Sequence, residues 1–243
     1  MSSTCPKKSG FIKQIKASTF SMNTKKILIF GTSQYAEIAA HYISIDTEYE
    51  VSGYVVDDEY YTSDNFAGKS VSKLSDTLAS MPPNEAYFFC AIGYKSIRQR
   101  RDIYQKLHML GYSFVSVKSK HAYCDPTATI GENSIIMPNC VIEKNAVIGD
   151  NVVVWSNSTV CHDAKINDHC FIASNSTIGG NAIIQEMSFL GFSSTVLQNT
   201  NCASETLLGA MSLLTQDSKK STKYVGVPAT ASGRHLKDGI CIP

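Results

Sequence analysis

The sequence lacks three features that would place it in common functional classes. Its 243 residues carry a net charge of +1 and only 18% are charged, so the overall charge does not favour binding to nucleic acid or to an anionic membrane. No apolar run approaches the roughly 20 residues that a membrane-spanning helix needs. There is neither a CxxC pair nor a secretory signal peptide. We therefore expect a cytoplasmic protein whose eight cysteines stay reduced.

A six-residue repeat runs without insertion or deletion from residue 124 to residue 219. Ile, Val or Leu occurs every six residues, with Cys124 and Cys202 at the two remaining positions. A small residue follows four places after each of these positions, and only Val152 breaks this second column. A fixed period over such a length is typical of a solenoid, in which each repeat buries its apolar side against the next.

The length of the period predicts the type of solenoid. Neither a helix nor an ordinary strand yields one large and one small inward position per six residues. A triangular prism does, with six residues per face and eighteen per coil, and it would be roughly 25 Å long. We therefore predict a parallel β-helix. Cys140 and Cys170 occupy inward positions that do not stack on successive coils, so they are expected to behave as small buried apolar residues.

The residues before the repeat alternate between strand and helix patterns, which is typical of a doubly wound α/β domain. We expect strands at 26–30, 51–56, 85–92 and 114–117, and helices at 35–45, 70–80 and 95–110. The predicted domains are a disordered tail (1–24), a Rossmann-like domain (25–120), the β-helix (121–231) and a C-terminal tail (232–243).

Polar residues follow the predicted strands at the edge where such domains bind ligands. The turn after the first strand has one glycine, Gly31, where a dinucleotide fingerprint has three, so hydride transfer is disfavoured. The helix that starts there still presents free N–H groups to an anion. Asp57 and Asp58 after the second strand are candidates for accepting hydrogen bonds from ribose or uracil, and a solvated acidic turn is an equal alternative.

The candidate catalytic pair is His162 and Asp163, which lie between the inward positions Val160 and Ala164 and are therefore expected on the outer surface. A carboxylate beside a histidine makes the imidazole a stronger base, suited to general base catalysis near neutral pH. Zinc is disfavoured, because Asn167 stands where hexapeptide carbonic anhydrases have a second histidine, and no serine lies in a nucleophile elbow.

These motifs together resemble the hexapeptide-repeat sugar acetyltransferases typified by the bacillosamine N-acetyltransferase and the sialic acid O-acetyltransferase. The resemblance covers the hexads, the segment VCHDAKI at 160–166, the ending YVGVPA at 224–229, and the strand-end motifs at 27–33, 54–58 and 88–93. It implies a left-handed β-helix, a homotrimer, acetyl-CoA as co-substrate and no metal.

The resemblance also implies residue roles. His162 would take the proton from the acceptor and Asp163 would support it, while an N–H at Gly180 would stabilise the oxyanion. Acetyl-CoA would run between two prisms and touch Phe171, Gly180, Phe192 and Ala210. The UDP- or dTDP-linked acceptor would contact Ser33, Gln34, Tyr35, Asp57, Asp58 and Gly93.

Two departures from the family pattern stand out. Gln34-Tyr35-Ala36 replaces a Gly-His-Gly-like turn, and Phe171 replaces a second histidine near CoA, with His169 two residues earlier expected at the surface. The leading hypothesis is acetylation of the amino group of a nucleotide-linked deoxyamino sugar in surface glycan biosynthesis. Sugar O-acetylation and a non-catalytic scaffold are the alternatives, and the scaffold predicts no binding of CoA.

Overall fold

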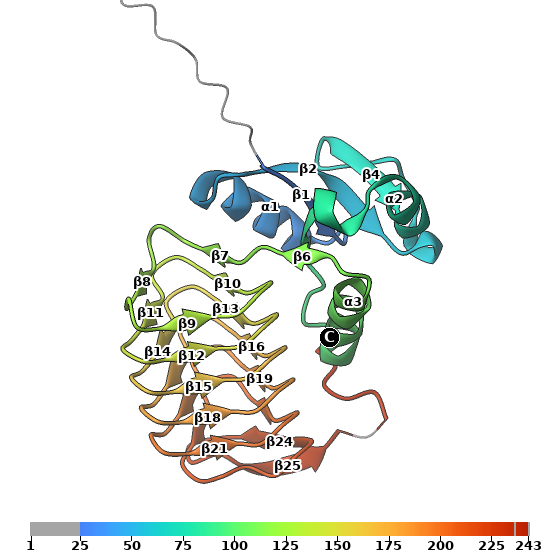
Figure 1. The fold of residues 1–243 in the computed structure, drawn as a ribbon. Helices are drawn as coiled ribbons and strands as arrows, with labels where there is room; N and C mark the ends of the chain where they lie inside the picture. Colours follow the sequence, from blue (N-terminus) through green and yellow to red (C-terminus); the bar gives the residue numbers. More distant parts are fainter. Residues whose placement is uncertain (1–24, 236, 243) are drawn as a thin grey trace, which may run out of the picture.

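The computed structural model describes residues 25–235 and 237–242, which form two parts (Figure 1). An α/β domain lies at the top of the picture, and a triangular prism of stacked short strands extends below it. The expected tail at residues 1–24 lies outside the described residues. The two predicted parts, an α/β domain and then a β-helix, are confirmed in that order.

The α/β domain, called the front domain below, is built on a six-stranded sheet in the order β3-β4-β2-β1-β5-β6. All neighbouring strands are parallel except the β3–β4 hairpin. The strands are β1 (Lys25–Phe30), β2 (Tyr49–Val56), β3 (Asn65–Phe66), β4 (Lys69–Lys73), β5 (Tyr87–Cys90) and β6 (Ser113–Phe114). The helices are α1 (Gln34–Asp46), α2 (Leu74–Ser80) and α3 (Ile97–Met109), with short 3-10 turns η1 (Asp58–Tyr60) and η2 (Pro83–Glu85).

Two predicted elements differ from the structure. The helix expected at 70–80 is strand β4 up to Lys73 and becomes helical only from Leu74. Val71 is buried and pairs with Tyr54 of β2, so the sheet prevails over the local helix pattern. The strand expected at 114–117 is divided: Phe114 ends β6, whereas Val117 begins β7 (Val117–Lys118), which pairs with β10 of the prism.

The prism has three faces, and from β7 to β23 the strands on each face are parallel and eighteen residues apart in sequence, as predicted; β25 pairs antiparallel with β24 at the end of the first face. The first face contains β7, β10, β13, β16, β19 and β22, followed by β24 and β25; the second contains β8, β11, β14, β17, β20 and β23; the third contains β9, β12, β15, β18 and β21. It is a left-handed β-helix. The remaining bounds are β8 (Tyr123–Cys124), β9 (Thr129–Ile130), β10 (Ile135–Ile136), β11 (Val141–Ile142), β12 (Val147–Ile148), β13 (Val153–Val154), β14 (Thr159–Val160), β15 (Lys165–Ile166), β16 (Phe171–Ile172), β17 (Thr177–Ile178), β18 (Ile183–Ile184), β19 (Phe189–Leu190), β20 (Thr195–Val196), β21 (Asn201–Cys202), β22 (Leu207–Leu208), β23 (Leu213–Leu214), β24 (Thr222–Val225) and β25 (Thr230–Arg234).

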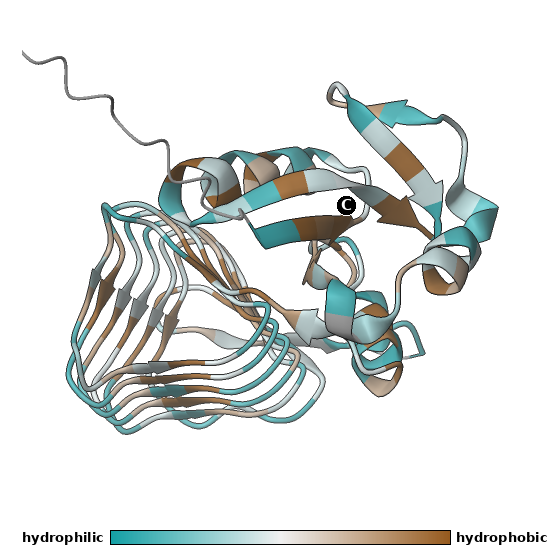
Figure 2. Cartoon of the chain, turned by 45° about the horizontal axis from the view of Figure 1, so that its top comes forward, coloured by the Kyte–Doolittle hydropathy of each residue, from teal (hydrophilic) through white to brown (hydrophobic). Residues whose placement is uncertain are grey.

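Both predicted inward columns are buried from Ser134 onward, whereas Cys124, Ala128 and Ile130 in the first coil are half-buried. The large aliphatic residues fill the interior, and hydrophobic residues recur at the same place in successive coils (Figure 2). The small residues also make hydrogen bonds. Ser176 Oγ donates to the carbonyl of Gly191, and Cys170 Sγ donates to that of Gln185. The small column therefore satisfies backbone carbonyls of the adjacent coil as well as filling the bend.

At the bends of the prism from residue 133 to residue 211, the residue before the small one lies in the left-handed backbone region. Asparagine occupies many of these places because its short polar side chain tolerates a positive φ better than most residues. This third column was missed in the sequence. Its members are Asn133, Asn139, Asn145, Asn151, Asn157, Asp163, His169, Asn175, Asn181, Met187, Ser193, Asn199, Glu205 and Met211.

These bends stack into three corners. The His162 corner lies between the second and third faces and carries residues 162–163 and 180–181. The Phe192 corner lies between the first and second faces and carries residues 192–193 and 210–211. The α3 corner lies between the third and first faces and carries residues 133, 151, 169, 187 and 205, named for the helix that packs along it.

Candidate active site and acceptor cavity

His162 and Asp163 form a hydrogen-bonded pair at the His162 corner. Asp163 is in the left-handed region with φ 60°, which turns its side chain toward its neighbour. Its Oδ2 lies 3.0 Å from Nδ1 of His162. The imidazole remains 58% exposed, so its other edge is open to a substrate. The Glu143 carboxylate accepts a hydrogen bond from the His162 backbone N–H at 2.8 Å and fixes the bend.

The surroundings of Asp163 keep it ionised. Asn145, one coil earlier, donates from Nδ2 to Asp163 Oδ1 at 3.0 Å. This bond makes the largest contribution to lowering the pKa of Asp163 below its ordinary value, and the hydrogen bond with His162 makes the next largest. An ionised carboxylate can only accept, so it orients the imidazole with the proton on Nδ1 and the lone pair on Nε2. The pair therefore presents a proton acceptor to the solvent side.

Gly180 lies directly over the imidazole, one coil further along the prism. A Cβ added at Gly180 would be 2.8 Å from both Cε1 and Nε2 of His162, closer than real side chains approach. Asn181 N donates to the carbonyl of His162, which holds the two coils in register. Within the described part of the chain, the Gly180 N–H makes no hydrogen bond. His162 Nε2 thus lies beside the residue that carries this free donor.

A second site is a cavity of about 590 Å³ between the front domain and the first face of the prism, called the front cavity. Its lining includes Ser33 and Ser96, the N-cap residues of α1 and α3, whose hydroxyls accept from Ala36 N and Gln99 N. Lys95 adds a cationic side chain. Two helix N-termini and a lysine around one cavity favour an anionic ligand.

Most of the predicted acceptor residues line this cavity. They are Ser33, Gln34, Tyr35, Asp57 and Gly93.

The two acidic residues at the end of β2 have different surroundings. Asp57 pairs with Lys106 Nζ at 2.7 Å, so its charge is already compensated. Asp58 is not among the residues that line the cavity. Its carboxylate accepts from Ser75 N at the start of α2, and the hydrogen bonds with Ser75 lower its pKa. Asp58 therefore caps a helix.

The four predicted CoA residues occupy three places within one chain. Gly180 lies at the His162 corner, and Phe192 and Ala210 lie at the Phe192 corner, where Phe192 is 60% exposed. Phe171 is instead buried on the first face, where it lines the front cavity. Its ring stacks on Phe189 with centroids 5.5 Å apart.

His169 corrects one expectation directly. It was expected at the surface, but it is only 6% exposed, because α3 covers its corner. Its ring lies edge-on to Tyr104 of α3, and Nδ1 is 3.1 Å from Nδ2 of Asn151. Burial lowers the pKa of His169 to about 4, so it is neutral at pH 7. It belongs to the interface between the two parts.

Several residues of both sites were missed in the sequence. Asn145 was detectable, because it lies eighteen residues before Asp163 and hence one coil away. Trp155 also had a signal, being the one tryptophan of the chain. It stacks on Phe171 and lines the front cavity together with Tyr94. Tyr94 lies at a strand end where the sequence pattern predicts ligand binding, but its contact with Phe171 depends on how the two parts pack.

The described residues contain neither a cluster of metal ligands nor a helix that could span a membrane. No group of three or more His, Cys, Asp or Glu side chains within 25–235 and 237–242 is arranged to hold a metal ion. Over the same residues, no helix has the length and apolar character to cross a membrane.

Comparison with known sequence families finds two matches. Residues 26–107 match the PglD N-terminal domain, and residues 119–222 match the GMPPB C-terminal domain. A search of curated proteins by sequence finds no match.

Several solved structures share both parts of the fold. The acetyltransferase domain of PglB from Neisseria gonorrhoeae, in complex with acetyl coenzyme A, is 25% identical, with a TM-score of 0.77 over 86% of this chain and 100% of that one. PerB from Caulobacter crescentus, in complex with CoA and GDP-perosamine, is 23% identical, with a TM-score of 0.77 over 86% and 97%. WeeI from Acinetobacter baumannii is 19% identical, with a TM-score of 0.73 over 85% and 100%.

Proposed function

The chain belongs to the hexapeptide-repeat sugar acetyltransferases, and we propose that it transfers the acetyl group of acetyl-CoA directly to the amino group of a nucleotide-linked deoxyamino sugar. The observation that carries the chemistry is the His162–Asp163 pair beneath Gly180. The likeness to a PglB domain solved with acetyl coenzyme A supports the donor, and the likeness to PerB solved with CoA and GDP-perosamine supports the acceptor class.

In this reaction the acceptor amine attacks the thioester carbonyl while His162 Nε2 takes a proton from the attacking nitrogen. Asp163 holds the imidazole in the required tautomer and stabilises the imidazolium that forms. The Gly180 N–H donates to the oxyanion of the tetrahedral intermediate. The intermediate then expels CoA thiolate, which takes the proton, leaving an amide and free CoA.

The front cavity holds the nucleotide part of the acceptor. The N-termini of α1 and α3 and the Lys95 ammonium face the diphosphate, while Trp155 and Phe171 provide an aromatic wall. Ser33, Gln34, Tyr35, Asp57 and Gly93 line the same cavity and are the residues we assign to the acceptor. Asp58 is left out of this assignment because its carboxylate caps α2. UDP and dTDP are the nucleotides we put forward.

The enzyme acts as a homotrimer in which each site is shared. The front cavity lies against the first face of the prism, whereas His162 lies at the corner between the second and third faces, and neither His162 nor Asp163 lines the cavity. A second copy of the chain brings its His162 to the acceptor of the first. Acetyl-CoA then runs in the groove between two prisms, past Gly180, Phe192 and Ala210.

A screen of nucleotide-linked sugars tests the proposal. Purified protein is mixed with acetyl-CoA and UDP-, dTDP- or GDP-linked amino sugars, thiol release is followed, and the product is identified by mass spectrometry. Matched sugars with a hydroxyl in place of the amine serve as controls. We expect release with at least one amino sugar and an amide product. Release with the hydroxyl sugars alone would establish O-acetylation, and CoA binding without transfer to any sugar would contradict the proposal.

A further inference from the structure

One wall of the front cavity is a single loop between β5 and α3. All six residues 91–96 line the cavity, and they follow Cys90, the last residue of β5. On one side, β5 pairs with β1, and Ala91 N donates to the carbonyl of Phe30. On the other side, β6 ends at Phe114, beside Phe88. The backbone of Cys90 therefore extends beyond the neighbouring strand.

The side chain of Asn133 takes the place of that missing strand. Its Oδ1 accepts from Cys90 N at 2.7 Å, and its Nδ2 donates to the carbonyl of Cys90 at 3.3 Å. Asn133 belongs to the first coil of the prism, has φ 53° and is fully buried, as is Cys90. Since Cys90 is buried, its backbone N–H and C=O depend on the Asn133 side-chain amide for their hydrogen bonds.

A second contact holds the loop two residues further on. Arg100 of α3 is fully buried and donates from Nη1 to the carbonyl of Ile92 at 2.7 Å. The same guanidinium donates from Nη2 to the carbonyl of Asn151 at 2.8 Å. Asn151 is one coil from Asn133 and accepts from its Nδ2 at 2.9 Å. Both contacts to the loop thus lead to one continuous polar column of the prism.

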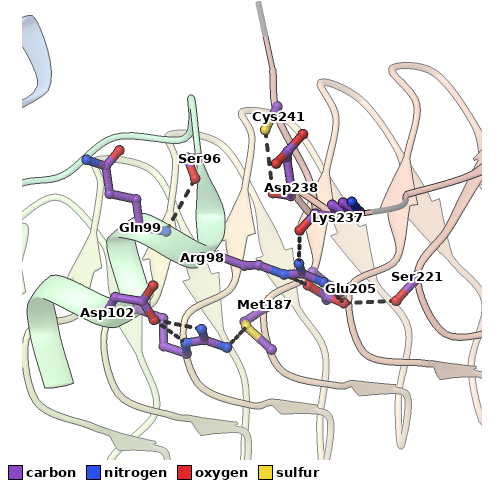
Figure 3. A network of polar contacts seen from close by, with 12 residues as sticks. Ser96, Arg98, Gln99, Asp102, Met187, Glu205, Ser221, Lys237, Asp238 and Cys241 are labelled. Atoms are coloured by element: carbon purple, nitrogen blue, oxygen red, sulfur yellow. Dashed lines mark hydrogen bonds and ion pairs between the residues drawn. The ribbon is translucent and has the colours of Figure 1, made fainter.

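The far end of the loop is held along the same corner (Figure 3). Arg98 forms a two-pronged ion pair with the buried Glu205 and donates to the carbonyl of Lys237 in the C-terminal segment. These contacts fix the first turn of α3, where Ser96 and Gln99 line the cavity. The loop is therefore held by the prism at its start, its middle and its end.

We propose that Asn133 is a positioning residue for acceptor binding, which it controls by placing the β5–α3 loop from the prism. The inference rests on the proposed function, because it takes the front cavity to be the acceptor site. Without the Asn133 amide, the backbone N–H and C=O of Cys90 turn toward water, and residues 91–96 move with them. The acceptor site is then altered while the His162 corner is unchanged.

The test compares Asn133→Ala with Asn139→Ala in steady-state acetyl transfer. Asn139 has nearly the same backbone, φ 61°, on the same coil, but its side chain is exposed at the Phe192 corner, so both variants carry the same conformational cost. We expect Asn133→Ala to raise the acceptor KM about tenfold and to leave the KM for acetyl-CoA and kcat at saturating acceptor unchanged. Asn139→Ala should change neither KM.

The pattern of the two KM values separates positioning from a structural role. A residue that only stabilises the fold lowers the amount of active enzyme and leaves both KM values unchanged. Equal acceptor KM values for the two variants, or parallel rises for both substrates, would overturn the inference. Arg100→Lys replaces Asn133→Ala if the latter does not fold, since an ammonium can reach Ile92 O or Asn151 O but does not span both. Failure of the proposed function would instead appear as an inactive wild-type enzyme.

Discussion

Replacing Gly180 by alanine tests the catalytic geometry with a single methyl group. The new Cβ would lie 2.8 Å from His162 Nε2, whereas ordinary contacts begin at 3.4 Å, so the ring must retreat by at least this difference. The imidazole is 58% exposed and can swing into solvent, so the fold is barely affected. Misplacement of a catalytic group by about 1 Å can cost about 100-fold in rate. We expect kcat to fall by about 10- to 100-fold.

The assay follows thiol release from acetyl-CoA at saturating concentrations of both substrates, together with thermal unfolding. An unchanged Tm with a reduced kcat would place the effect of Gly180→Ala in the chemistry. The KM for the acceptor should stay near that of the wild type, because the front cavity is formed by other residues. A kcat equal to that of the wild type would refute the assignment of His162 Nε2 as the proton acceptor next to Gly180.

Two further predictions concern stability and pH. The pKa of His169 is about 4 in the folded chain against 6.5 ordinarily, so between these values only the unfolded chain binds the proton, and stability falls as pH drops. The free energy of unfolding, measured with urea, should fall by about 2 kcal/mol between pH 7 and pH 5. His169→Gln should remove most of this pH dependence, and an equal pH dependence in both proteins would contradict the prediction. Arg98 lowers the pKa of Glu205, whose stabilisation is therefore present above the ordinary value of 4.5 and is lost as pH falls below it. Glu205→Gln should lower the free energy of unfolding by about 1–2 kcal/mol at pH 7 and by little at pH 3. Glu48→Gln, which removes an exposed ion pair, should leave it almost unchanged. Similar losses in the two variants would argue against a role for burial.

The prism was predictable from the sequence because each coil repeats the same local requirements. Val160 and Ala164 belong to columns whose period alone determines which side chains point inward, and the structure keeps that register throughout. His162 and Gly180 are eighteen residues apart, so their stacking followed from the same arithmetic. The left-handed asparagine column was equally periodic, but its conformational meaning was overlooked.

What escaped prediction depends on how the front domain meets the prism. Helix α3 packs along one corner, and this contact buries His169 and places Phe171 in the front cavity. The sequence around His169 and Phe171 does not indicate that another domain covers them. An outward position on a solenoid is exposed only if nothing packs over it. Asp58 shows the same limit on a smaller scale, because its partner Ser75 follows in a helix whose start was misplaced.

The central claim is that His162 is the general base of acetyl transfer, and His162→Ala tests it most directly. The side chain is 58% exposed, so the variant should unfold near the wild-type temperature and keep the wild-type assembly. With the amino sugar identified by the screen, the rate of CoA release should fall by about 100-fold or more. A folded His162→Ala enzyme that transfers acetyl at nearly the wild-type rate would contradict the account.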